Sequence, residues 1–163
     1  MNPKVSIIMG STSDLPIMEK AAKILDDFGI PFEINALSAH RTPDQAMEFA
    51  KGAYKRGICV VIAGAGGAAH LPGVIAALTP VPVIGVPIKA SISIDGWDSL
   101  LSIVQMPPGI PVASVGINRG ENAALLAAQI LGLKYPEISA FHQEYRIKME
   151  NKVISSQKEI TET

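Results

Sequence analysis

The sequence predicts an α/β fold in which helices cover both faces of a parallel β-sheet. Short apolar runs alternate along the chain with longer stretches whose apolar residues recur at helical spacing. Most of these short runs are continuous, which is typical of parallel strands buried on both faces. Right-handed crossovers between such strands then leave a three-layer αβα sandwich, most simply a flavodoxin-like doubly wound parallel sheet.

Five segments are expected to form the strands. The first is continuous and apolar from Val5 to Met9 and ends before Gly10, whereas the second alternates apolar residues with Glu33 and Asn35. The expected strands are residues 5–9, 31–37, 58–63, 82–86 and 110–115.

Helices are expected between these strands and after the last one. In residues 15–28 apolar side chains recur at a spacing of about 3.6 residues, and Gly29 follows, as is common after a helix end. The expected helices are residues 15–28, 43–56, 70–78, 100–104 and 122–131. The last of these is so apolar that it must be buried on most sides.

The C-terminal segment lies outside this pattern. Its large apolar residues recur at steps of three and four with charged residues between them, which predicts an extra amphipathic helix. These positions are Ile138, Phe141, Tyr145, Met149 and Val153. We divide the chain into a catalytic domain, residues 1–134, and a C-terminal helix and tail, residues 135–163. The helix could pack on its own domain, but we expect it to dock on a neighbouring subunit and its last turns, about eight residues, to fray.

Composition limits the class of protein. The 163 residues fit one domain, and 14 basic against 15 acidic residues give a net charge of −1, which argues against nucleic acid as a partner. Apolar residues, counted with the 14 glycines and without the three tyrosines, make up about 55% of the chain, against 45–50% in a typical domain. A domain of this size has too little interior to bury that surplus, so we expect a homo-oligomer.

Cysteine content and hydropathy point to a cytoplasmic protein that does not contact a membrane. The single cysteine, Cys59, excludes a disulfide scaffold and stands in an apolar run where a buried thiol is expected. Residues 58–88 carry no Asp, Glu, Lys or Arg, but five glycines and four prolines break them into pieces too short to span a bilayer.

Three loops are candidates for a functional site. In this fold ligands bind beyond the carboxyl ends of the strands, where the strand order reverses. Polar or glycine-rich loops follow the first three predicted strands, at residues 10–14, 38–43 and 64–70. The predicted topology therefore brings these loops to one edge of the sheet.

The first loop contains Ser11, Ser13 and Asp14 and leads into a helix. Free N–H groups at a helix start and serine hydroxyls favour an anion such as phosphate. A carboxylate would repel phosphate, so Asp14 is better suited to accept hydrogen bonds from ribose hydroxyls. The alternative is that Ser13 or Asp14 only caps the helix.

The second loop places His40 beside Arg41, with Ser38 upstream. A guanidinium suits bidentate contact with phosphate, and an imidazole both gives and takes a proton near neutral pH. The alternative is an exposed histidine next to an arginine in a surface salt bridge.

The third loop matches the dinucleotide-binding spacing G-x-G-x-x-A, but it follows the third strand and lacks the expected acidic partner, so we interpret the match as coincidental. Its glycines, Gly66 among them, allow the backbone to approach a compact planar group, and several N–H groups there could bind a carboxylate or carbon dioxide. His70 either contacts the ligand or only begins a helix, and the residues leave both open.

The sequence lacks the motifs of several other kinds of chemistry. The chain has no Walker A sequence for ATP-driven phosphoryl transfer and no G-x-S-x-G elbow for a hydrolase. Its three histidines, at positions 40, 70 and 142, lack the spacing of a metal site, so no metal is expected. A mononucleotide or phosphosugar ligand with one histidine as proton shuttle remains.

The motifs Gly-Ser-Thr-Ser-Asp at 10–14, Ser-Ala-His-Arg-Thr-Pro at 38–43 and the glycine-rich run at 63–73, with residues 99–107 and 122–131, carry a family resemblance. Together they resemble 5-(carboxyamino)imidazole ribonucleotide mutases, the bacterial branch of the phosphoribosylaminoimidazole carboxylase catalytic-subunit family. The resemblance spans roughly residues 4–133. The Arg-Thr-Pro form looks like the mutase branch rather than the carboxylases that use carbon dioxide directly.

This resemblance implies an isomerase of purine (IMP) biosynthesis that works without metal or cofactor and forms octamers. The reaction would move a carboxylate from the exocyclic nitrogen of an aminoimidazole ribonucleotide to ring carbon four, by decarboxylation and recarboxylation. By the same resemblance His40 is the acid and base, and residues 66–70, from Gly66 to His70, enclose the carboxylate. The implied ribonucleotide contacts are Ser11, Ser38 and Arg41 to the phosphate, Asp14 to the ribose, and Ser13 in support of the same loop.

Three places depart from the family pattern: Trp97, Pro108 and residues 118–121. They bear on subunit contacts and on the wall of the site. Two other functions stay open at this point, direct carboxylation by carbon dioxide and a non-catalytic mononucleotide-binding module.

Overall fold

The computed structural model, which describes residues 4–161, has one parallel five-stranded sheet in the order β2-β1-β3-β4-β5. The strands are β1 (Lys4–Met9), β2 (Phe32–Ala36), β3 (Ile58–Gly66), β4 (Val83–Ile88) and β5 (Ala113–Ser114). The order reverses beside β1, which confirms the predicted flavodoxin-like sheet. The carboxyl ends of β1, β2 and β3 therefore lie at one edge.

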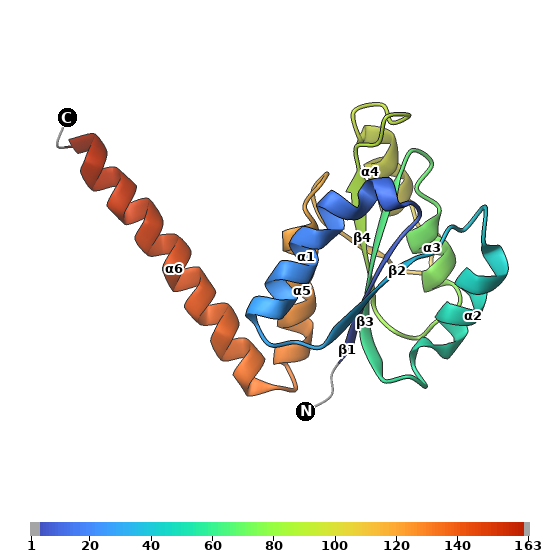
Figure 1. The fold of residues 1–163 in the computed structure, drawn as a ribbon, viewed down its shortest axis with the longest axis horizontal. Coiled ribbons are helices and arrows are strands. Elements are labelled where there is room, and N and C mark those ends of the chain that lie inside the picture. The colour runs from blue at the N-terminus through green and yellow to red at the C-terminus, as the bar shows by residue number, and fades with distance from the viewer. Residues whose placement is uncertain (1–3, 162–163) are drawn as a thin grey trace.

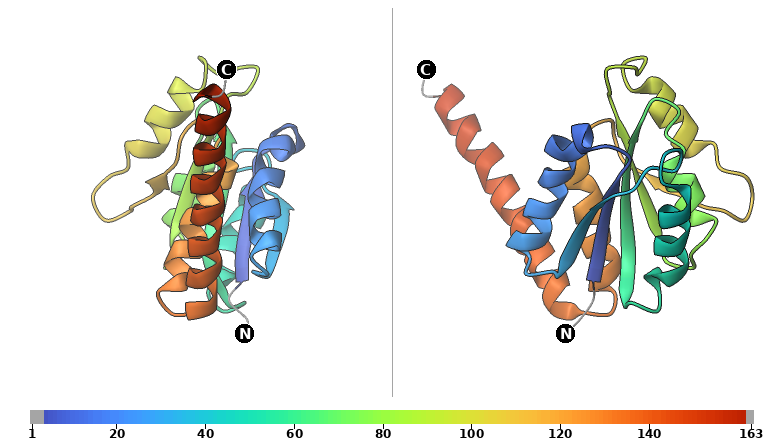
Figure 2. Two further views of the ribbon diagram at one scale, coloured as in Figure 1. Left: turned by 90° about the vertical axis from the view of Figure 1, so that its left-hand side faces the viewer. Right: turned by 45° about the vertical axis from the view of Figure 1, so that its right-hand side comes forward.

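Helices form a layer on each face of this sheet (Figure 1; Figure 2). On one face lie α1 (Leu15–Asp27) and α5 (Gly120–Gly132). On the other lie α2 (Pro43–Ala53), α3 (Leu71–Ala76) and α4 (Trp97–Val104). Because side chains alternate along a strand, Ile7 of β1 packs under α1 and α5 while its neighbour Ile8 packs under the other layer.

Small residues let α1 and α5 approach closely. A Cβ on Gly120 would lie 2.3 Å from the carbonyl oxygen of Ile17, so only glycine fits there. Ala123, Ala124 and Ala127 of α5 are fully buried. The prediction that this apolar helix is buried on most sides is thus confirmed.

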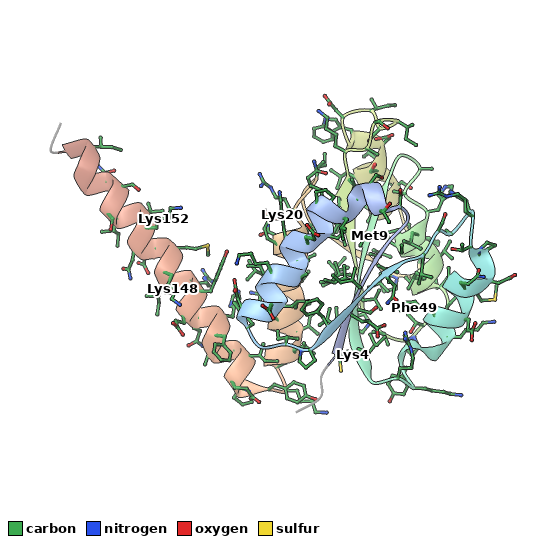
Figure 3. The ribbon with its side chains drawn as sticks, in the orientation of Figure 1. Lys4, Met9, Lys20, Phe49, Lys148 and Lys152 are labelled. Carbon is green, nitrogen blue, oxygen red and sulfur yellow. The ribbon has the colours of Figure 1, made fainter. Side chains whose placement is uncertain are left out.

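The C-terminal helix, α6 (Pro136–Thr161), begins against its own domain and then leaves it. Ile138 is buried, and the rings of Phe141 and Tyr145 lie 6.3 and 5.9 Å from the ring of Phe28. Figure 3 shows Lys148 and Lys152 on the part that projects away.

No helix in residues 4–161 is long and apolar enough to cross a membrane.

Several boundaries differ from the prediction. α6 is helical up to Thr161 and contains no glycine or helix-breaking proline after its first position. The fraying expected for the last eight residues stays a prediction, and residues 162–163 lie outside the described residues. β5 is only two residues long, because Pro111 lacks the N–H that a longer ladder would need. α4 begins three residues before the predicted start, directly after Gly96, whose φ of 84° is left-handed.

Cys59 is half-buried and not fully buried as expected. Ile58 and Val60 pair with the consecutive residues Lys4 and Val5 of β1. Cys59 is thus the extra residue of a β-bulge, and its thiol contacts the carbonyl oxygen of Gly57 at 3.6 Å.

Candidate active site

A cavity of about 430 Å³ lies beyond the carboxyl ends of the strands, and the structure brings every predicted site residue to its lining. The three predicted loops meet there. The predicted residues on the lining are Ser11, Ser13, Asp14, Ser38, His40, Arg41, Gly66 and His70. The folding topology alone accounts for this meeting, because the residues come from β1, β2 and β3.

The first loop forms a single 3-10 turn, Thr12–Asp14, before α1. Ser11 caps it, since its Oγ accepts hydrogen bonds from the Ser13 backbone N–H at 3.3 Å and the Ser13 hydroxyl at 3.0 Å. The capping alternative for Asp14 is wrong, because its side chain makes no capping hydrogen bond to α1. Ser13 does not cap α1 either, since it lies inside the 3-10 turn.

Asp14 is a buried carboxyl group on the cavity wall. The residue is only 5% exposed. Burial raises the pKa of Asp14 above its ordinary value, while hydrogen bonds from the Ser13 hydroxyl and the Ser11 backbone oppose that rise. A carboxylate with so little water around it gains from hydroxyl donors, such as those of a sugar.

The second loop is locked by its own side chains. Thr42 Oγ1 accepts from the Ser38 N–H at 2.9 Å and donates to the Ser38 carbonyl at 3.1 Å, while Ser38 Oγ accepts from the Arg41 N–H at 3.1 Å. The Arg41 guanidinium reaches back to donate to the carbonyl oxygen of Gly10 at 3.0 Å. Within residues 4–161 it makes no salt bridge, so the surface-ion-pair alternative is wrong for Arg41.

The third segment differs from a simple loop. β3 runs to Gly66, which was predicted to lie in the loop, because residues 61–66 pair in register with β4. A Cβ on Gly66 would lie 2.7 Å from the Cβ of Ala90. The turn that follows has left-handed φ angles at Gly67 (59°) and Ala69 (47°), and it ends at His70.

His40 and His70 face each other across the cavity mouth. Nε2 of His40 lies 2.7 Å from Nδ1 of His70, and the rings are edge to face with centroids 4.9 Å apart. At that distance one nitrogen donates its N–H and the other accepts. The sequence left the role of His70 open, and no local signal indicates this pairing across 30 positions.

The structure adds one wall that the sequence did not predict. Residues 90–92, after β4, also line the cavity. The Ser93 hydroxyl donates to Asp98 Oδ1 at 2.6 Å and accepts from the Gly96 N–H at 2.9 Å, which fixes this segment. The available signal was topological, because β4 is the neighbour of β3 and its carboxyl end lies at the same edge.

Together these groups suit one kind of ligand. Serine hydroxyls and a guanidinium on one side can bind a phosphate, a buried carboxyl group can bind a ribose, and an imidazole pair can exchange protons with a base. In residues 4–161 no group of three or more His, Cys, Asp or Glu side chains is arranged to hold a metal ion.

A family model described as AIR carboxylase matches residues 4–152. The chain belongs to this family. It is 61% identical to N5-carboxyaminoimidazole ribonucleotide mutase of Pyrococcus horikoshii, over 98% of this chain and 90% of that protein. It is 60% identical to the protein of the same name from Thermotoga maritima, over 93% and 88%.

Relatives with another name and solved structures complete the comparison. Phosphoribosylaminoimidazole carboxylase of Saccharomyces cerevisiae is 55% identical over 98% of this chain, which corresponds to 27% of that longer protein. A crystal structure of Treponema denticola PurE superposes with a TM-score of 0.84 at 31% identity, covering 96% of this chain and 98% of that one. This likeness agrees with the αβα sandwich described above.

Proposed function

We propose that this protein is an isomerase of purine biosynthesis that converts N5-carboxyaminoimidazole ribonucleotide into 4-carboxy-5-aminoimidazole ribonucleotide. Its similarity to mutases over nearly the whole chain supports this function. The observation that carries it is the imidazole of His40 on the wall of the same cavity as Arg41 and the serine hydroxyls. A module that only binds an anion would not need the facing imidazoles of His40 and His70.

The ribonucleotide would bind along the first two loops. Ser11, Ser38 and Arg41 hold the phosphate, and Asp14 accepts hydrogen bonds from the ribose, while Ser13 supports the first loop. In this placement the buried carboxyl group of Asp14 contacts the ribose hydroxyls and does not contact the negatively charged phosphate. The turn from Gly66 to His70 then lies against the carboxylate of the base.

His40 would donate one proton to the exocyclic nitrogen and later accept one proton from ring carbon four. The bond between the exocyclic nitrogen and the carboxyl carbon breaks, carbon dioxide leaves, and the electron pair stays on nitrogen, which takes a proton from His40. Ring carbon four then attacks carbon dioxide to form the new carbon–carbon bond. The proton on that carbon returns to His40 and the ring regains its aromaticity, so the cycle needs no external acid or base.

The released carbon dioxide has to stay in place between these two steps. Gly66 and Ala68 line the cavity beside the buried residues Ala65 and Ala69, so this wall is compact and largely apolar. Exclusion of water at that wall keeps the one-carbon fragment beside the ring. We expect no cofactor to take part.

We also propose that the working form is a homo-octamer in the cytoplasm and that residues 135–163 dock on a neighbouring subunit. The second half of α6 extends beyond the domain and exposes apolar side chains, among them Ile147, Val153 and Ile160. A phosphorylated substrate does not pass through lipid, which supports a cytoplasmic site of reaction.

The alternative is direct carboxylation of the free amine by carbon dioxide. The test supplies the purified protein, without ATP, with either the carbamate in bicarbonate-depleted buffer or the free amine with excess bicarbonate. A mutase converts the carbamate much faster than the amine. Faster conversion of the amine would make the protein a carboxylase, and no conversion of either would contradict both.

A further inference from the structure

We propose that Ser102 of α4 is a positioning residue that aims His70 at His40, an inference that rests on the proposed function. The Ser102 hydroxyl donates a hydrogen bond to the carbonyl oxygen of Ala68. Ala68 and Ala69 lead directly into His70. Ser102 does not line the cavity, and its hydrogen bond restrains the backbone that carries one half of the imidazole pair.

The turn before His70 has a strained backbone conformation that needs an additional restraint. Ala69 has a φ of 47°, in the left-handed region that a residue with a Cβ avoids, and it is only 4% exposed. Within the turn, one backbone hydrogen bond, from the Ala69 N–H to the Gly66 carbonyl at 3.1 Å, holds this conformation. A strained residue persists where its surroundings over-determine it, and the Ser102 hydroxyl supplies a second restraint.

α4 is anchored well enough to serve as a rigid support. One turn before Ser102, the buried hydroxyl of Ser99 donates to the carbonyl oxygen of Ile88 at 3.0 Å, at the end of β4. Ile103 of α4 is fully buried in the core. The Ser102 hydroxyl is therefore fixed relative to the sheet, and its hydrogen bond to Ala68 fixes the position of the turn in the same way.

The imidazole contact is sensitive to small movements of this turn. Nε2 of His40 and Nδ1 of His70 are 2.7 Å apart, and such a hydrogen bond weakens steeply once its atoms move by a few tenths of an ångström. His40 is held by the locked second loop, so His70 is the partner that moves when the turn relaxes. Without Ser102 the two rings would separate while the phosphate-binding loops keep their shape.

The first test is the kinetics of Ser102→Ala. We expect kcat to fall about 10- to 100-fold, because misplaced proton-transfer groups cost that much, and KM to stay within about twofold, because loops 10–14 and 38–43 are untouched. Ser102→Thr keeps the hydroxyl and should restore most of kcat. Ser114→Ala is the matched control, since its hydroxyl also bonds a backbone carbonyl, that of Val115 at 3.2 Å, away from the cavity.

The second test does not depend on activity. In a crystal structure of Ser102→Ala we expect the His40–His70 nitrogen distance to exceed about 3.5 Å, the limit of a hydrogen bond. An unchanged imidazole contact, a kcat close to that of the parent, or equal losses in Ser102→Ala and Ser114→Ala would overturn the proposal. A parent protein without turnover would instead contradict the proposed function, while the crystallographic distance would still report on the positioning.

Discussion

At the scale of single residues, the proposed chemistry depends on the imidazole of His40, which lines the cavity and lies 2.7 Å from that of His70. Ser11, Asp14, His40 and Arg41 follow predicted strands, and the topology placed them on one cavity. The facing of His40 and His70 depends on a left-handed turn at Ala69, a conformation for which alanine gives no signal.

His40→Asn should lower kcat by a factor of about 100 or more while ribonucleotide binding persists, since general acid–base catalysis contributes on that scale. Turnover and the dissociation constant of a non-reacting analogue, measured on the same sample, separate the two effects. His142→Asn is the matched control, because His142 lies on α6 outside the cavity lining. Near-normal turnover of His40→Asn would remove it from the reaction.

At the scale of elements, the spacing of apolar residues predicted nearly every helix and strand. Where these elements begin and end depends on strand pairing and packing in the folded chain. β3 continues to Gly66 because glycine lets it pack beside Ala90, and a pattern based on side chains stops at the first glycine. The amphipathic stripe predicted α6, but only the packing of Phe141 and Tyr145 on Phe28 shows where the helix leaves its domain.

Glu33 of β2 links β1 with the turn before β3. It forms ion pairs with Lys4 of β1 and with Arg56 of that turn, 3.2 Å away, and it accepts a hydrogen bond from Ser6 of β1 at 3.1 Å. Burial disfavours its ionised form, but the Lys4 hydrogen bond, the Arg56 charge and the Ser6 hydroxyl prevail and lower the pKa of Glu33. A lowered folded pKa means that this stabilisation is present above the ordinary value of 4.5 and is lost as pH falls through the folded value.

Glu33→Gln should therefore lower the free energy of unfolding at pH 7 by about 1 kcal/mol, a figure that allows for partial screening by solvent. The deficit should shrink as the pH drops below 4.5. Urea unfolding at several pH values measures it. Glu19→Gln, an exposed change on α1, should have little effect at any pH, and a pH-independent deficit for Glu33→Gln would contradict the electrostatic explanation.

At the scale of the whole molecule, α4 is one of the elements that leave large apolar side chains exposed. Trp97, Leu101 and Val104 are all exposed and recur at steps of four and three, so they form an apolar stripe along α4, and Ile94 in the loop before it is exposed as well. Such an exposed apolar stripe is typical of an interaction surface. Composition indicated that apolar surface is left over, but the structure was needed to locate it.

Leu101→Lys should break the proposed assembly into smaller species, because a buried interface does not accommodate an unpaired charge. Sedimentation velocity compares it with the parent and with Leu133→Lys, a change at an exposed leucine away from the stripe. A parent chain that sediments as a monomer would contradict the octamer, and an intact Leu101→Lys assembly would exclude the stripe from its interfaces.

Ile92 on the cavity wall is 82% exposed in the single chain. We expect a neighbouring subunit of the proposed assembly to cover it and to close the cavity.

The fate of the carboxyl carbon tests the proposed transfer directly. The carbamate is labelled with ¹³C at its carboxyl group and converted in buffer that contains unlabelled bicarbonate. We predict that the product keeps the label at ring carbon four. A product that carries unlabelled carbon from the buffer would contradict the transfer of a retained carboxyl group.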